Sequence, residues 1–480
     1  MQTQNRPYTV SEKNYTIKRF QPINENRHAC FYTHERESIE FNYERKLYNV
    51  GGEMVADPRT RHSFVLAFDN YGNEMESVSV AYGRRHDNDS LNTEEQRLQS
   101  ENKVVYNENK YTNEVDTQHL YRLPSPWKQK TWEIGDCEVP EDGLLFSFEE
   151  VKQIIENLRG GANEVPYEDV NGDGSSGAGP YRRFIRNLKT LYRSDDLEEI
   201  LPTGQLESLG LPGEKFSYVF TPGLLQNVFI DSGKTTPDEI ESALSYSGYF
   251  TTAQLQAEGL FTELDDSPGW WQSTGKVFYS TDETHTPAQE RTYAYEHFFL
   301  PHRYADPFSN STKAIYDDYD LLILQVEDAL HNKTTAGERE ESGAITHVGI
   351  DYRVVQPYLV TDANGNRSAV VYDILGLVAG TAFMGKSGEV KGDSLTGFTP
   401  DLDDSTIIQH LQNPLQSPLS ILGSATSRFV YDFWAFHRSS EAPVVYTLDR
   451  ETHVSDLAPG SNTQVQHTFE YSDGFGRVIQ

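Results

Sequence analysis

Alternation of apolar and polar residues with a period of two is the clearest pattern along the chain. The runs His62–Phe68 and Glu76–Tyr82, separated by an Asp-Asn-Tyr-Gly turn, predict a β-hairpin with one buried face. A second hairpin is predicted where Tyr358–Val360 leads into Asn364-Gly365 and returns as Ala369–Tyr372, because Asn-Gly favours the tight turn of a hairpin loop. The pattern predicts an all-β fold with a few short helices.

Helices are predicted where a cap residue precedes a short periodic run. Ser147 and Glu150 form a capping box, and Thr236 and Thr286 each stand directly before a proline, which is favoured at the first helical position. The predicted helices cover 151–158, 238–244, 288–298 and a segment between Asp404 and Pro414.

The segment Gly160–Pro180 is rich in Gly, Asn, Asp and Ser, and is predicted to be a surface loop or a boundary. We therefore expect three parts. They are a β-rich module over 1–145, an irregular β region with short helices over 146–300, and a repeat array of strands over 301–480.

Aspartates recur with a regular spacing in the C-terminal half of the chain. The intervals from Asp306 to Asp317, from Asp317 to Asp328 and from Asp362 to Asp373 are each 11 residues, which suits one strand plus one turn. A short Asp side chain caps its own turn through the following backbone N–H. The expected repeat turns are the Asp-x-x-x-Asn segments, namely Asp69 with Asn73, Asp306 with Asn310, Asp328 with Asn332 and Asp362 with Asn366, and the Tyr-Asp pairs Tyr316-Asp317, Tyr372-Asp373 and Tyr431-Asp432. Ordinary hairpin turns that fall into step by chance are the alternative.

The acidic excess narrows the range of partners. The 480 residues include 73 Asp and Glu against 41 Lys and Arg, a formal net charge of -32. Because nucleic acids and anionic membranes bind basic faces, neither is an expected partner. Aromatic residues reach 12%, whereas disordered chains are depleted in them, so the chain is expected to fold.

Cysteine content and hydropathy bear on the compartment. Cys30 and Cys137 form no CxxC or zinc pattern, which fits a chain without a disulfide framework, although a single bridge stays open. Residues 1–15 contain no apolar stretch of a Sec signal peptide, and no window is apolar for long enough to span a membrane. If the protein leaves the cell, another route is expected to export it.

The Tyr-Asp pairs resemble those of the Rhs/YD-repeat family, and longer runs resemble the B component of the bacterial insecticidal toxin complexes (Tc toxins). The segment Tyr8–Tyr121, with Val80–Arg85 inside it, is similar to the middle module of that component. The other similar runs are Phe220–Asp231, Thr236–Gly248, Ser267–Trp271, Gly275–Tyr279 and Asn366–Val370.

The resemblance implies a non-enzymatic role without a cofactor, and a secreted protein that is made in the bacterial cytoplasm. In that family, β-strand repeats of the B and C components wind into a hollow shell around the cytotoxic C-terminal segment of C, and a propeller of B docks on the pore-forming A component. The expected partner is therefore a C-type Rhs protein carrying a toxic effector. The propeller and the N-terminal domain of the family find no counterpart here, so contact with an A-type component is expected only through regions outside this chain. The run Phe469–Arg477 resembles the start of another repeat.

One segment matches the phosphate-binding P-loop pattern. Residues Gly380–Ser387 read GxxxxGK[ST], but a P-loop needs a helix after the lysine, and residues 388–392 are poor helix formers. The run 321–328 imitates a magnesium-binding strand, yet it precedes the pattern and ends in a repeat aspartate. Nucleotide binding is not expected.

Metal sites find little support in the sequence. Residues Asp169–Gly174 begin like a calcium loop, but the twelfth position is Pro180 instead of Glu, so a solvated loop is favoured. His297 and His302 lie five apart, off any shared helical face, and are expected to be surface or hydrogen-bonded histidines. No metal ligand set is predicted.

Two further segments admit a binding function. The basic stretch Tyr181–Arg193 is followed by acidic residues at 195–199, so local charge pairing is expected instead of RNA binding. Trp270 and Trp271 could stack a sugar, although aromatic residues that anchor a loop are the preferred interpretation. Neither a GxSxG elbow nor a Ser-His-Asp or Cys-His set is recognisable, so no catalytic residue is predicted.

The predicted function is a part of a β-shell that shields a toxic effector before delivery. Two alternatives stay open. One is an extracellular carbohydrate-binding or adhesion protein that uses Trp270 and Trp271, and the other is a glycoside hydrolase on a β scaffold.

Overall fold

Strands dominate the computed structural model, which describes residues 7–24, 27–88, 90–140, 143–161, 163–170, 179–262, 268–474 and 477–479. Within these residues the helices are short, the longest being α2 (Phe148–Leu158). The predicted all-β class with a few short helices is confirmed.

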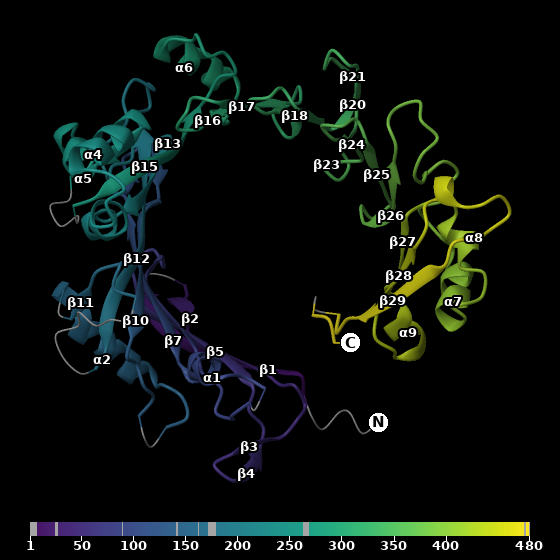
Figure 1. Cartoon of the computed structure of the whole chain (residues 1–480). Helices are drawn as coiled ribbons and strands as arrows, with labels where there is room; N and C mark the ends of the chain where they lie inside the picture. Colours follow the sequence, from purple (N-terminus) through teal and green to yellow (C-terminus); the bar gives the residue numbers. More distant parts are fainter. Residues whose placement is uncertain are drawn as a thin grey trace. The chain divides into compact units, whose positions relative to one another are not determined.

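The chain divides into two compact units (Figure 1). Unit 1 comprises 1–277, 286–291 and 306–309, and unit 2 comprises 278–285, 292–305 and 310–480. The division into parts at 145 and 300 stays a prediction.

Unit 1 is built on consecutive antiparallel strands, each paired with the next long strand along the chain. In order they are β1 (Thr9–Gln21), β2 (Cys30–Asn42), β5 (Arg59–Phe68), β6 (Glu74–Ala81), β7 (Lys103–Tyr111), β10 (Pro126–Gly135), β12 (Tyr181–Arg193), β13 (Leu211–Phe220) and β15 (Trp270–Phe278). The predicted first hairpin is confirmed as β5 and β6.

Short elements fill the connections of unit 1. The strands are β3 (Tyr48–Val50), β4 (Glu53–Val55), β8 (Val115–Asp116), β9 (Tyr121–Arg122), β11 (Glu164–Val165) and β14 (Tyr249–Thr251). The helices are α1 (Thr93–Ser100), α2, α3 (Pro222–Leu225), α4 (Pro237–Tyr246) and α5 (Thr252–Ala257). β11 lies inside the predicted loop 160–180 and pairs in parallel with β12, so this segment is partly ordered into the sheet.

The main core of unit 1 lies between α2 and the sheet. Val151, Ile155 and Leu158 recur at helical spacing and pack against buried residues of β5, β6, β7 and β10. Among those residues Phe64 and Val78 are fully buried. Because the apolar residues of α2 lie on one face, the helix packs that face on the sheet and exposes its opposite face to solvent.

Unit 2 continues the same antiparallel pattern with shorter strands. In order they are β16 (Arg303–Ala305), β17 (Ser311–Tyr316), β18 (Ile323–Glu327), β19 (Lys333–Thr335), β24 (Leu359–Thr361), β25 (Arg367–Tyr372), β26 (Val378–Met384), β27 (Ser427–Asp432), β28 (Val444–Arg450) and β29 (Val465–Tyr471). Two small hairpins lie between β19 and β24, namely β20 (Gly337–Arg339) with β21 (Ile345–Val348) and β22 (Ile350–Asp351) with β23 (Gln356–Pro357). The second predicted hairpin is confirmed as β24 and β25.

Part of unit 2 is a single sheet layer. All six residues of β25 are half-buried, although the strand has a neighbour on each side. A strand packed against a second layer alternates between buried and exposed positions instead. Beyond β26, α7 (Asp404–Gln412) and α8 (Leu419–Leu422) pack on β27 and β28 and close a core around Leu422, Val430 and Tyr446.

The helix starts predicted at Ser147, Thr236 and Thr286 are confirmed, and the fourth helix starts one residue earlier than expected after Asp404. Ser147 and Thr236 each form a capping box with the glutamate three residues on. Thr286 precedes α6 (Pro287–Glu296), and Asp403 caps α7, which ends before Pro414. α9 (Ala435–Ser439) was not predicted, and it lies in the connection between β27 and β28.

Both cysteines are free thiols, so no bridge joins them. Cys30 is exposed, whereas Cys137 is buried, and burial raises the pKa of its thiol to about 12. Among the helices that the structure describes, none is both long and apolar enough to cross a membrane.

Candidate functional site

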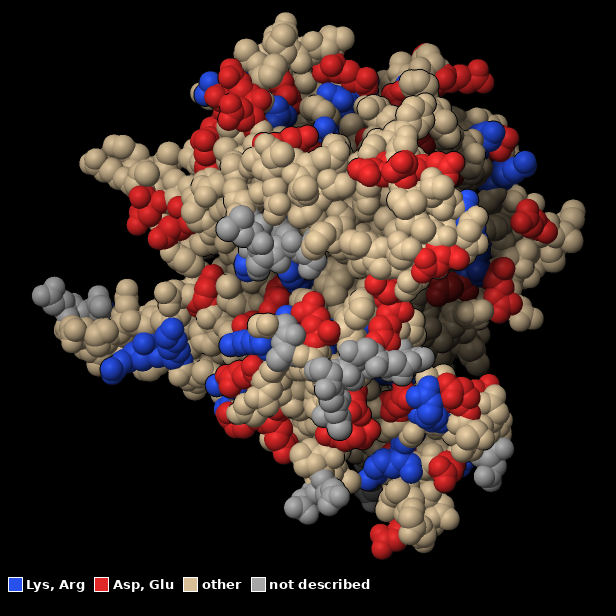
Figure 2. Space-filling model, turned by 60° about the vertical axis from the view of Figure 1, so that its left-hand side comes forward, with Lys and Arg blue, Asp and Glu red and all other residues tan. Residues whose placement is uncertain are grey.

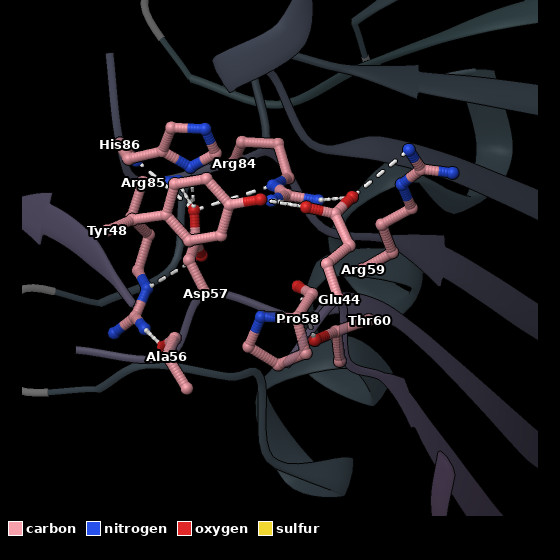
Figure 3. A network of polar contacts seen from close by, with 10 residues as sticks. All are labelled: Glu44, Tyr48, Ala56, Asp57, Pro58, Arg59, Thr60, Arg84, Arg85 and His86. Atoms are coloured by element: carbon pink, nitrogen blue, oxygen red, sulfur yellow. Dashed lines mark hydrogen bonds and ion pairs between the residues drawn. The ribbon is translucent and has the colours of Figure 1, made fainter. Parts of the chain in front are cut away.

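A polar groove of about 1090 Å³ lies in unit 1 over the ends of β2, β5 and β6. Its floor is formed by strand residues such as Glu40 and Arg61, and its rim by the loop that follows β6, which carries Tyr82, Arg84 and His86. Several of these side chains belong to one network of polar contacts (Figure 3).

Asp57 is the centre of that network. Its Oδ2 accepts hydrogen bonds from the backbone N–H groups of Arg85 (3.0 Å) and His86 (3.2 Å) and lies 2.6 Å from His86 Nδ1. Its Oδ1 accepts a bond of 3.3 Å from Arg85 Nε, and the Asp57 side chain is only 3% exposed. Burial by itself raises the pKa of Asp57, but the hydrogen bonds from His86 and Arg85 outweigh it and hold that pKa below its ordinary value.

Arg84 connects Asp57 to a second carboxylate. Its Nε lies 3.5 Å from Asp57 Oδ2, and its two terminal nitrogens each donate to Glu44 at 3.3 Å. Tyr48 and Arg59 contact Glu44 as well, and the Tyr48 ring stacks on His86 with centroids 3.9 Å apart. The hydrogen bond from Arg84 lowers the pKa of Glu44, so the carboxylate remains charged near neutral pH.

Gly83 allows the loop to approach α1 closely. A Cβ atom at Gly83 would lie 1.9 Å from the carbonyl oxygen of Ser100, a distance that excludes any side chain without movement of the backbone. Close packing therefore fixes the loop that presents Arg84, Arg85 and His86.

His86 and Asp57 form a hydrogen-bonded pair of imidazole and carboxylate, but no nucleophile accompanies the pair among the described residues that line the groove. The pair His86–Asp57 has the geometry that orients a general base, but the residues that line the groove include neither Ser nor Cys. The hydroxyl of Thr60 donates to the carbonyl of Pro58 at 3.4 Å and faces no base. The arrangement thus holds the loop that follows β6 in place through Arg84, Arg85 and His86.

Sequence reasoning found only part of this network. Arg84 and Arg85 lie inside the quoted run Val80–Arg85, whereas Asp57 and His86 were missed. Asp57 carries no local signal, since its partners lie 28 and 29 residues further along the chain.

The repeat aspartates occupy turns with one shared geometry. At Asp69, Asp328 and Asp362, Oδ1 accepts the N–H groups of the second and fourth following residues at 2.8–2.9 Å, and Oδ2 accepts the side-chain amide of the asparagine in fourth position. The residue in third position has a positive φ, which is 87° at Gly365 and 63° at His331. Asp373 repeats the pattern with Leu377 instead of asparagine.

The asparagines of these segments close the turns that the aspartates open. Asn73 is half-buried and directly precedes β6, and both its backbone N–H and its side-chain amide donate to Asp69 at 2.9 Å. Its carbonyl in turn accepts the N–H of Asp69 at 3.0 Å, so Asn73 and Asp69 form the pair that closes the hairpin loop. Asn332 before β19 and Asn366 before β25 hold the same position.

The remaining repeat aspartates accept backbone N–H groups at other positions of their turns. Asp317 accepts the N–H groups of Leu321 and Leu322, and Asp306 accepts that of Phe308, with Asn310 directly before β17. Asp432 differs because α9 follows it, and its carboxylate accepts the N–H of Trp434 and pairs with Arg438 instead of closing a hairpin.

Two tyrosines of the Tyr-Asp pairs make the same contact. Tyr316 and Tyr372 each donate to the carbonyl of a proline 15 residues earlier, Pro301 at 3.1 Å and Pro357 at 3.0 Å. Tyr431 donates to Val378 at 2.9 Å. Each hydroxyl thus fastens its strand to an earlier segment.

The tryptophan pair belongs to the core. Trp271 is fully buried, its Nε1 donates to Thr252 at 3.0 Å, and its ring contacts Phe261 and Tyr218 edge to face. Trp270 is 8% exposed. Neither ring is accessible to a sugar, which removes the residues on which the carbohydrate-binding alternative was based.

The P-loop pattern lies on a strand. Gly380–Met384 belong to β26, and no helix begins after Lys386 until α7, a segment that the structure describes throughout. The expected absence of a phosphate-binding helix at this position is confirmed. Most of the calcium-like loop, residues 171–178, lies outside the described residues.

The basic stretch Tyr181–Arg193 forms β12, and its arginines pair across the fold. Arg182 pairs with Glu164 at 2.7 Å, Arg183 with Glu133, and Arg193 with Glu290 at 3.0 Å. These arginines thus pair with other elements of the fold, and Arg193 also donates to the carbonyl of Leu197 within the segment 195–199. On the face that Figure 2 shows, basic side chains form separate small groups among acidic ones.

His297 and His302, expected to be surface or hydrogen-bonded histidines, lie close together with Asp320 in unit 2. His297 Nδ1 is 3.0 Å from Asp320 Oδ1, and the two histidine rings have centroids 5.2 Å apart. The ligand atoms of the three residues all lie within 4.8 Å of one another. Burial lowers the pKa of His302, so that imidazole is neutral near neutral pH.

Comparison with known proteins finds a family model that matches the N-terminal part of the chain. Residues 1–134, which include the whole Asp57 network, match the family model described as "Insecticide toxin TcdB middle/C-terminal region". Residues 1–134 are thus similar to that family over about a quarter of the chain. The resemblance to the Tc toxin B component is confirmed for this part of the chain.

Solved structures of TcdB2-TccC3 are similar over 98% of this chain. One matches at 20% identity with a TM-score of 0.49, and the TcdB2-TccC3-Cdc42 structure matches at 18% identity with a TM-score of 0.47. The chain spans about a fifth of the length of these proteins, namely 20% and 22%. A search of curated proteins found no match.

Proposed function

We propose that this chain is a B-type component of a Tc toxin complex and forms part of a β-shell that encloses a cytotoxic effector. The family match over residues 1–134 carries the proposal. Enclosing an effector requires a shell wall and no chemical reaction. We therefore propose a non-enzymatic protein that acts by confining the effector. Its partner is a C-type Rhs protein that carries the effector, and contact with an A-type pore component involves regions outside this chain.

The consecutive antiparallel strands support a wall. Each long strand of either unit pairs with the next one along the chain, and β25 is half-buried on both faces. A sheet of one layer has two accessible surfaces, one of which can face an enclosed cargo. The repeat turns reverse the chain at short intervals, which keeps strands such as β17 and β18 to five or six residues.

The edge of β29 (Val465–Tyr471) that faces away from β28 is the proposed pairing edge for the partner. Ser472 donates to Pro443 and Glu451 donates to Gln464, so the even-numbered residues of β29 bond to β28. The N–H and C=O groups of Val465, His467 and Phe469 therefore point to the opposite edge. Ile479 already donates to Tyr471 on that side at 2.7 Å, which shows where an additional strand would lie.

Co-expression of the chain with a C-type Rhs partner tests the proposal. The expected result is a co-purifying complex that appears as a hollow particle by electron microscopy. A solid particle, or no association, would overturn the proposal.

A matched pair of variants tests the edge of β29. His467→Pro removes one outward N–H without touching the ladder to β28, and His467→Ala removes the same side chain but keeps that N–H. Both variants lose the contact of His467 with Tyr446, so that contact does not contribute to their difference. We expect the proline variant to fold and to lose the partner, while the alanine variant retains it.

We further propose that the assembled complex acts outside the producing cell after synthesis in the bacterial cytoplasm. Detection of the chain in the culture supernatant of intact producing cells, without a cytoplasmic marker, would support this localisation. Retention in the cells under conditions that release the partner would contradict it.

A further inference from the structure

The turn after α6 brings two histidines together that a helix would separate. Phe298 and Phe299 both have positive φ, 54° and 53°, and the N–H of Phe299 donates to the carbonyl of Ala294 at 2.7 Å. The chain therefore reverses directly after His297. This reversal places the rings of His297 and His302 with centroids 5.2 Å apart.

A repeat turn supplies the carboxylate. Asp317 accepts the N–H groups of Leu321 and Leu322 at 2.7 and 2.9 Å and closes the turn between β17 and β18. Asp320 is the residue of that turn with positive φ, and its N–H donates to the carbonyl of Asp317 at 3.0 Å. The backbone that carries Asp320 is thus fixed by the turn. Its two carboxylate oxygens lie 3.0 and 3.1 Å from His297 Nδ1.

His302 presents a buried nitrogen that lacks a partner. The residue is 2% exposed, and its ring packs against Tyr293 and Tyr316 with centroids 5.1 and 4.9 Å away. Nδ1 lies 3.3 Å from the carbonyl of Ala314, which fixes the proton on that nitrogen. Nε2 has no hydrogen-bond partner among the described residues. A buried polar atom without a partner is costly, and a metal-bound histidine has this same arrangement, with one nitrogen bonded to a carbonyl and the other to the ion.

We propose that His297, His302 and Asp320 bind a divalent transition-metal ion, which by ligand type is zinc. Two imidazole nitrogens and one carboxylate are a frequent zinc ligand set, with water or a further group in the fourth position. Bonds of roughly 2.0–2.2 Å place zinc ligands closer together than the observed limit of 4.8 Å. Binding therefore requires side-chain rotation at His297, which is 32% exposed and gives the ion access from solvent. The ion would tie the end of α6 to the β17–β18 turn.

Zinc binding to the tag-free full-length chain tests this site. We expect one zinc ion per chain by elemental analysis after desalting, and a higher melting temperature in the presence of zinc. His297→Ala and Asp320→Asn, both at partly exposed positions, should lower the affinity for zinc by about tenfold or more. Asparagine tolerates the positive φ of residue 320, so the second variant keeps the turn.

His331→Ala is the matched control. His331 also pairs with a carboxylate, that of Glu327, at 2.6 Å. It does not belong to the group of three possible metal ligands found among the described residues, which is His297, His302 and Asp320. We expect this variant to bind zinc as the unchanged protein does. Absence of zinc binding by the folded unchanged protein, or equal affinity in Asp320→Asn, would overturn the proposal. Neither outcome bears on the shell proposal, because the tests use different readouts.

Discussion

Replacement of Asp57 by Asn should destabilise unit 1 through the loop that follows β6. The carboxylate accepts two backbone N–H groups and His86 on one oxygen and Arg85 on the other. An amide keeps the shape, but in either orientation it turns an NH2 group towards at least one of these donors. The variant also removes the charge that faces Arg84 at 3.5 Å.

The expected loss follows from the size of these interactions. A hydrogen bond to a charged group contributes about 1.5–3 kcal/mol, and breaking a buried ion pair costs roughly 3–5 kcal/mol. In the variant Arg84 keeps its ion pair with Glu44, so the loss of stability should lie below the upper value for a broken buried ion pair. We expect the free energy of unfolding to fall by about 2–4 kcal/mol.

The pH dependence gives a second signature of the same carboxylate. The pKa of Asp57 is lower in the folded protein than its ordinary value of about 3.9, so the charged form stabilises the fold. That contribution is complete above the unfolded-state pKa and is lost as the pH falls through the folded-state pKa. The stability difference between the unchanged protein and Asp57→Asn should therefore be constant near neutral pH and shrink below about pH 4.

Urea unfolding and amide hydrogen exchange measure these effects. The amides of Arg85 and His86 donate to Asp57, so their exchange should accelerate in the variant. Asp87→Asn is the control, because it makes the same charge change at an exposed neighbouring residue. A loss below about 1 kcal/mol, or an equal loss in the control, would refute the reasoning.

Two further predictions concern the repeat turns and the core. Asp362→Ala should lower the free energy of unfolding by about 0.5–2 kcal/mol, as the loss of a helix cap does, and should accelerate hydrogen exchange of the Asn364 and Asn366 amides. The control Asp318→Ala, at an exposed position, should leave the exchange of these amides unchanged. Slow exchange in Asp362→Ala would argue against the role of Asp362 in the turn. Trp271→Ala should cost about 3–5 kcal/mol because the ring is fully buried, whereas Trp434→Ala, at a 64% exposed position, should cost little in urea unfolding. A folded Trp271→Ala variant that loses glycan binding present in the unchanged protein would contradict this assignment.

The sequence by itself determined the local structure. The hairpin at Asn364-Gly365, the capping boxes at Ser147 and Thr236, and the turns at Asp69 and Asp362 follow from side chains that bond to backbone within a few residues. Such contacts depend on short-range geometry, which a sequence pattern reports directly. The alternation with period two likewise predicted the all-β class.

Only the tertiary structure decided which distant residues meet. Asp57 finds His86 through the register of β5 and β6, and Asp320 finds His297 through a repeat turn and a reversal after α6. The burial of Trp271 depends on β13, β15 and α5 packing together. These contacts join segments 19 to 29 residues apart, and no local pattern encodes them, because strand order and packing set the partners. The tertiary fold therefore determines the candidate sites, while the local sequence determines the turns that position their residues.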